Sequence, residues 1–174
     1  MNWVEVKVTD EILERAQVMA DRMGAIKNSI RKGQGNLAGF IGELIVEHYI
    51  GDVQLQSTKD YDMWLFPLSN DPLSVDVKTK QRTVKPRGEY TCHIAATSEH
   101  QKCDIYIFCQ VNLKPKLRAW ILGWMTKKDF MKKSVALKKG QSLKDVGYND
   151  DDFKQKADGN VLLISDLRDI KDIP

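Results

Sequence analysis

The segment Leu73–Thr79 alternates apolar and polar residues along its length. A period of two residues predicts a half-buried β-strand, because successive side chains of a strand point to opposite faces. Val75 and Val77 then face the core, while Asp76 and Lys78 project together from the other face. The strand therefore carries a carboxylate and an ammonium group side by side, about 6–7 Å apart at their Cα atoms.

Two amphipathic or apolar helices are predicted before this strand. Thr9 or Asp10 caps the first, with acidic residues in its first turn, and Gly24 ends it. Asn36 caps the second, which continues to about Ile50 and is stopped by Gly51. The segment between the helices, residues 27–35, is basic and glycine-containing and is predicted to be a loop.

The remaining pattern is that of short strands. Residues 61–66 form a hairpin with residues 73–79 through a turn at residues 69–72, and further strands are expected at 89–95, 104–111 and 118–125. Residues 96–102 are a short helix or a loop, and Thr126 caps a helix that reaches about Ser134. This order predicts an α/β or α+β fold in which helices flank one mixed sheet.

Size and composition limit the possible classes of protein. The chain has 174 residues, of which 42% are hydrophobic and 29% charged, as expected for one domain over residues 1–174 with a real core. It contains no apolar run of about 20 residues and no signal-peptide pattern, so we expect a soluble, cytoplasmic protein with no membrane partner. Its three cysteines lack a CxxC spacing and are expected to be reduced thiols.

Three carboxylates are candidate metal ligands. Glu43 lies in a helix whose apolar positions cover most of its circumference, where a carboxylate is near an end, paired, or bound to a cation. Asp62 lies in the predicted hairpin strand, residues 61–66, which pairs with the strand of Asp76. Oxygen ligands suit Mg²⁺ or Mn²⁺, with the Val77 carbonyl as a further ligand, and either one or two ions fit the pattern.

A basic segment follows the charged strand. The net charge is only +3, yet no acidic residue lies between Asp76 and Glu89. The candidate nucleic-acid-binding residues of this segment are Lys80, Gln81, Arg82, Lys85 and Arg87. A solvated loop is the alternative for each of them, and a solvated face is the favoured interpretation of the second basic run, residues 127–139.

The order of these motifs resembles the PD-(D/E)xK nuclease superfamily, and is similar to its small phage- and bacteria-encoded members. The resemblance covers about residues 36–125 and is carried by Gly39-x-x-Gly42-Glu43, Tyr61-Asp62 and Asp76-Val-Lys78. In the pattern of that superfamily Glu43 is the helix acid, Asp62 and Asp76 are the strand acids, and Lys78 is the lysine. Tyr61 departs from the usual proline, and Asp60 is a rival for Asp62 that the family-like placement disfavours.

The resemblance implies a restriction-endonuclease-like three-layer sandwich, with the N-terminal helix and the C-terminal tail packed on the core. It implies an Mg²⁺-dependent deoxyribonuclease, expected to be an endonuclease, in which Glu43, Asp62, Asp76 and Lys78 are catalytic. A phage-encoded protein that acts in the host cytoplasm fits the same resemblance.

Three alternatives stay open at this point. Asp76 and Lys78 could form a surface salt bridge on an edge strand. The chain could also be a catalytically inactive nucleic-acid-binding module or a protein-interaction module on the same fold. A homodimer would bring two sites to two strands of DNA, but no segment identifies an interface, and nothing separates one DNA structure from another.

Overall fold

A mixed β-sheet forms the centre of the structure, a computed structural model that describes residues 3–23, 36–56, 58–68, 71–147 and 154–174. Its strand order is β1-β7-β6-β4-β3-β2, and a second sheet has the order β5-β9-β8. Among the described residues β4 and β6 pair in parallel, and the other strand pairs are antiparallel. The strands are β1 (Val4–Val6), β2 (Val53–Leu55), β3 (Met63–Leu65), β4 (Leu73–Gln81), β5 (Thr91–Ala95), β6 (Ile105–Asn112), β7 (Arg118–Thr126), β8 (Val135–Leu137) and β9 (Gly159–Leu163).

The helices cover the residues that the sequence predicts, while Gly24, the predicted end of the first helix, and the predicted loop at 27–35 lie outside the described residues. Helix α1 spans Asp10–Met23, and the Thr9 hydroxyl caps it by accepting a hydrogen bond of 3.2 Å from the Ile12 amide. Helix α2 spans Asn36–Ile50, and α3 spans Lys127–Lys133 with Thr126 as its side-chain cap. Short 3-10 turns are η1 (Ala96–Ser98), η2 (Lys144–Val146), η3 (Ile164–Asp166) and η4 (Ile170–Asp172). Within the described ranges no helix is both long and apolar enough to cross a membrane.

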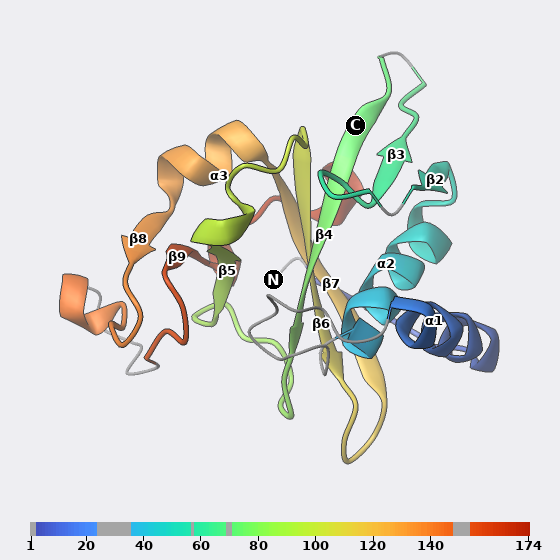
Figure 1. Ribbon diagram of the computed structural model, residues 1–174, viewed down its shortest axis with the longest axis horizontal. Helices are drawn as coiled ribbons and strands as arrows, with labels where there is room; N and C mark the ends of the chain where they lie inside the picture. Colours follow the sequence, from blue (N-terminus) through green and yellow to red (C-terminus); the bar gives the residue numbers. More distant parts are fainter. Residues whose placement is uncertain (1–2, 24–35, 57, 69–70, 148–153) are drawn as a thin grey trace.

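The central sheet is covered differently on its two faces. Helices α1 and α2 pack on one face, and the second sheet together with α3 covers the other (Figure 1). The predicted α+β arrangement of a mixed sheet with flanking helices is confirmed, but the prediction of a single sheet did not include the second sheet on this face. The seven residues of α3 are too few to cover that face, and the apolar residues of β5 and β9, Cys92, Ile94 and Leu162 among them, complete its core.

The predicted hairpin is confirmed, but its two strands differ in length. Strand β3 has three residues and β4 has nine, and they pair only between Leu73 and Val75. Beyond Val75 the strands diverge, so this edge of β4 continues without a paired strand among the described residues. The divergence creates a fork at which the backbone of β4 is open on one side.

The tail of the chain returns to the central sheet. The Trp124 and Arg168 backbones exchange two hydrogen bonds of 3.0 Å. Gly123 precedes this contact with a φ of +142°, and a β-carbon there would overlap the Arg168 carbonyl oxygen. Glycine is therefore required where the tail crosses β7.

Candidate active site at the fork of β3 and β4

Asp62 lies at the fork, directly before β3, and forms hydrogen bonds to the edge of β4 that β3 leaves unpaired. Its backbone amide donates to the Val75 carbonyl at 2.9 Å, and its carboxylate oxygen Oδ2 accepts from the Val77 amide at 2.7 Å. The carboxylate thus occupies the place of a neighbouring strand. Because the N–H and C=O groups of one strand residue point to the same edge, the Val77 carbonyl also faces this open edge.

Asp76 and Lys78 share one face of β4, as the alternation predicts. The Lys78 ammonium lies 2.6 Å from Oδ2 of Asp76, whose side chain is only 3% exposed. Val75 and Val77 point to the opposite face and belong to the core beneath α2. The pair is therefore a largely buried ion pair, not the surface salt bridge of an edge strand.

Glu43 approaches this region from α2. Its oxygen Oε2 is buried and has no hydrogen-bond partner among the described residues. The pKa of Glu43 is raised from 4.5 to about 9, chiefly by burial and then by the negative charges of Asp62 and Asp76, against a smaller opposing effect of Lys78. The helix can come this close because Gly42 has no β-carbon: one placed there would overlap the Thr79 hydroxyl on β4.

The pKa of Asp62 is shifted by burial and by the charges of Asp76 and Lys78 as well. Burial raises its pKa from 3.8 to about 7, with Asp76 as the next contribution, while the hydrogen bond from the Val77 amide and the charge of Lys78 act in the opposite direction. Glu43, Asp62, Asp76 and Lys78 therefore interact electrostatically with one another. The four residues come from α2, from the segment before β3 and from β4, and meet at the fork.

Gln101 is a polar residue of this region that the sequence patterns did not single out. Its amide oxygen accepts from the Lys78 ammonium at 2.8 Å, and its amide nitrogen lies 3.4 Å from Oδ1 of Asp76 and 3.2 Å from the Lys59 carbonyl. The strand order does indicate that the loop with Gln101 lies near Asp76. Since β4 and β6 are parallel neighbours with Asp76 opposite Tyr106, the loop before β6 must lie at the Asp76 end of β4.

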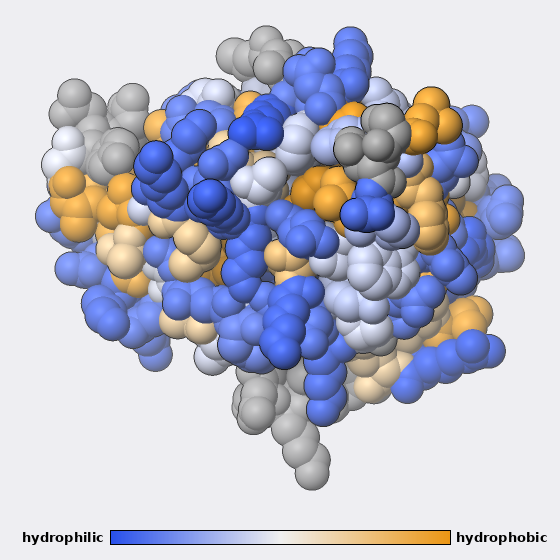
Figure 2. Space-filling model, turned by 90° about the horizontal axis from the view of Figure 1, so that it is seen from above, coloured by the Kyte–Doolittle hydropathy of each residue, from blue (hydrophilic) through white to orange (hydrophobic). Residues whose placement is uncertain are grey.

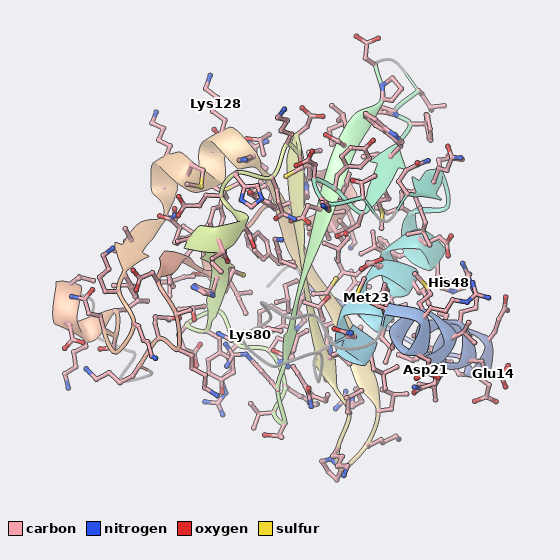
Figure 3. The ribbon with its side chains drawn as sticks, in the orientation of Figure 1. Glu14, Asp21, Met23, His48, Lys80 and Lys128 are labelled. Carbon is pink, nitrogen blue, oxygen red and sulfur yellow. The ribbon has the colours of Figure 1, made fainter. Side chains whose placement is uncertain are left out.

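The basic segment is only partly gathered in one place. The Lys80 side chain extends from β4 toward β5, with its ammonium 3.4 Å from the Thr91 carbonyl (Figure 3). The Arg82 and Arg87 guanidinium groups lie 4.5 Å and 5.8 Å from the centre of the Tyr90 ring. Gln81 ends β4. Lys85 lies near Glu5 of β1 instead. The pKa of Glu5 is lowered chiefly by its hydrogen bond with Arg118, and the charge of Lys85 contributes to the same shift.

The donor set at the fork fits a hard cation in its chemistry. It consists of carboxylate oxygens and the Val77 carbonyl, the ligand types that Mg²⁺ and Mn²⁺ prefer. A cation would also relieve the unpartnered Glu43 oxygen and the mutual repulsion of the carboxylates. Within the described part of the chain, however, no group of three or more His, Cys, Asp and Glu side chains is arranged as a finished metal cage. The Lys78 ammonium lies against one of the two Asp76 carboxylate oxygens, Oδ2.

Comparisons with known proteins leave the family of this chain open. No protein-family model matches the sequence, and no curated protein matches it either.

Proposed function

We propose that this protein is a metal-dependent deoxyribonuclease that hydrolyses phosphodiester bonds, as an endonuclease. The observation that supports it is the meeting of Glu43, Asp62, Asp76 and Lys78 at the point where β3 leaves β4. A structural role for the cluster is a poor explanation, since buried carboxylates that repel one another destabilise a fold. Strongly perturbed acids in one place are typical of functional sites. The PD-(D/E)xK resemblance and the restriction-endonuclease-like fold belong to the same proposal.

The residues have distinct roles in this proposal. Asp62, Asp76 and the Val77 carbonyl hold the ion, and Glu43 completes the site directly or through water. A bound Mg²⁺ or Mn²⁺ would polarise the scissile phosphate as a Lewis acid. Lys78 places a positive charge beside Asp76, where it can stabilise negative charge that develops on the phosphate oxygens or orient the attacking water.

The DNA backbone would be held by the basic segment that follows β4. Lys80, Gln81, Arg82 and Arg87 supply the contacts, and Lys85 adds one from its separate position near Glu5. The cation–π contacts of Arg82 and Arg87 hold these two side chains around Tyr90. Figure 2 shows the molecule from the top of Figure 1, the end near β3 and the start of β4, and this face is largely hydrophilic with several hydrophobic areas, whereas residues 80–87 lie toward the opposite end of β4.

Cleavage of end-labelled DNA tests the proposal. A panel of duplex, nicked, branched and single-stranded substrates is incubated with the protein and Mg²⁺ or Mn²⁺, and in parallel with EDTA. We expect cleavage only with the metal, and its loss in Asp76→Ala and in Lys78→Ala while both variants stay folded. Full activity of either variant would overturn the proposal.

The same assay separates the inactive alternatives. A binding module would retain DNA in a salt-dependent manner and never cut it. A protein-interaction module would do neither.

A further inference from the structure

Gln101 touches both members of the buried ion pair on β4. Its amide oxygen accepts from Lys78, and its amide nitrogen faces the Asp76 oxygen that Lys78 does not use. The three side chains therefore form a closed ring of contacts, in which Asp76 holds Lys78 through one oxygen and faces Gln101 through the other.

The charges of its neighbours fix the orientation of the Gln101 amide. A flipped amide would place its NH₂ group against the ammonium and its oxygen against the carboxylate, so that both contacts would become repulsive. A glutamate at this position could accept from Lys78 but would repel Asp76. Only a neutral group with a donor and an acceptor satisfies both partners at this length of side chain.

The loop that carries Gln101 is fastened at several points. The Lys127 ammonium donates to the Glu99 and Gln101 carbonyls. Asp104 accepts from the Ser74 amide and hydroxyl at 2.9 Å and 2.6 Å, which ties the end of the loop to the start of β4. The position of Gln101 is therefore set by the fold and does not depend on its contact with Lys78.

We propose that Gln101 is a positioning residue. It holds the Lys78 ammonium in its orientation, so that Asp76 is not the sole partner of this positive charge. This inference rests on the proposed nuclease function. The Lys78 ammonium is carried on four flexible methylene groups. With Asp76 as its sole partner, its position would depend on that carboxylate alone. With Gln101 present, the ammonium is shared between two acceptors from different segments, β4 and the loop before β6. Preorganised charge of this kind contributes to the rate without adding to substrate binding.

The test compares Gln101→Met with the wild-type protein. Methionine keeps the approximate length of the side chain but offers Lys78 and Asp76 no comparable hydrogen bond. Gln54→Met, at an exposed position of β2, is the matched control. Two measurements are made: kcat and KM for DNA cleavage with Mg²⁺, and the nitrogen-15 NMR signal of the Lys78 ammonium in the metal-free protein, assigned by its loss in Lys78→Ala.

We expect kcat of Gln101→Met to fall by about 10–100-fold, as is usual for residues that orient the reacting groups, with little change in KM. The Lys78 signal should shift or broaden, and Gln54→Met should change neither quantity. Should Gln101→Met not fold, Gln101→Ala takes its place, since it introduces no bulk.

Each other outcome decides the question. A wild-type kcat in Gln101→Met, or an unchanged Lys78 signal, overturns the role of Gln101 while leaving the nuclease function intact. A wild-type protein that cuts no DNA with either metal overturns the nuclease function, and the proposed role of Gln101 falls with it. In that case a shifted Lys78 signal would show only that the contact exists.

Discussion

At the scale of single residues, Glu43 shows how the surroundings of a carboxyl set its protonation. Its neighbours on α2, Leu44, Ile45 and Val46, are buried, and the part of the chain that the structure describes offers its oxygen Oε2 no donor. A charged carboxylate without a partner is strongly disfavoured in such a place. The apolar helix around Glu43 is visible in the sequence, which is why the conflict could be recognised there.

The raised pKa of Glu43 predicts how stability depends on pH in the metal-free protein. Between pH 4.5 and about 9 the unfolded chain has lost the Glu43 proton while the folded chain keeps it. The folded state then binds more protons, so the free energy of unfolding falls as pH rises through this range, by at most about 1.4 kcal/mol per pH unit for one proton.

Urea unfolding at pH 5, 7 and 9 in EDTA measures this effect. Glu43→Gln cannot ionise, and we expect its stability to decline less steeply than that of the wild type between pH 5 and 9. Asp62 contributes in the same direction up to about pH 7, so part of the decline remains in the variant. Equal slopes for the two proteins would contradict the prediction.

Residue patterns alone could identify Asp76 and Lys78 but not Gln101. The pair is separated by two positions in one strand, and local periodicity determines that both project from one face. Gln101 lies 23 residues after Lys78 in a loop, and its contacts depend on how β6 aligns with β4. No local pattern contains that information.

At the scale of elements, the approach of α2 to β4 determines where Glu43 lies. Gly42 faces the Thr79 hydroxyl, and a β-carbon at this position would overlap it. Gly39, one turn earlier in the same helix, has no atom of the described residues within 4 Å of the place where a β-carbon would be. The two glycines therefore offer a matched pair of substitutions.

We predict opposite effects for the two alanine substitutions. Gly42→Ala should destabilise the protein by about 1–3 kcal/mol, the usual effect of overpacking, and should displace Glu43. Gly39→Ala should be neutral or stabilising by up to about 1 kcal/mol, since alanine favours the helix. Urea unfolding measures both, and Thr79→Ala should recover part of the loss caused by Gly42→Ala. Equal effects of the two substitutions would exclude the close contact.

The elements that the sequence predicted are those with a long or strongly marked pattern. Both long helices, the hairpin, and the strands β6 and β7 are confirmed. Strands β1, β2 and β8 have three residues each, too few to establish a period of two. Strand β9 contains the apolar residues Val161, Leu162 and Leu163 but no alternation, and its pairing with β5 could not be predicted because the partners are nearly 70 residues apart.

At the scale of the whole molecule, the small net charge hides an uneven distribution. Basic side chains from residues 80–87 lie at and beyond the end of β4, the strand that carries Asp76 and Lys78. Gln110 and Asn112 of β6 hold this segment through hydrogen bonds of 2.6 Å and 3.1 Å to the Val84 carbonyl. The fold therefore fixes the segment at two of its residues, since the Arg82 amide also donates to the Val111 carbonyl.

Removing charge from this segment should weaken DNA retention in EDTA. For Arg87→Ala we expect the slope of log affinity against log salt to decrease by about one unit if Arg87 contacts a phosphate. Lys128→Ala is the matched control, because Lys128 points away from the molecule on α3 (Figure 3). Filter binding of labelled DNA at several salt concentrations measures the slope. Identical slopes for both variants would remove the segment from the DNA interface.

Metal binding should stabilise the whole fold. A ligand that binds only the folded state adds about 2.7 kcal/mol at a concentration of 100 times its Kd. We expect Mg²⁺ or Mn²⁺ to raise Tm of the wild type, and to raise it much less in Asp76→Asn, which keeps the shape of the ligand but not its charge. A Tm that does not respond to either ion would contradict the metal site.

The sequence by itself determined the two long helices, the alternation of β4 and the types of residue at the site, because each depends on neighbours a few positions apart. Tertiary structure alone decided that a second sheet covers one face, that Asp62 bonds to the open edge of β4, and that Gln101 joins Lys78. These features require segments far apart in the chain to align within a few ångströms. Such alignment follows from the packing of the entire core, and no single segment encodes it.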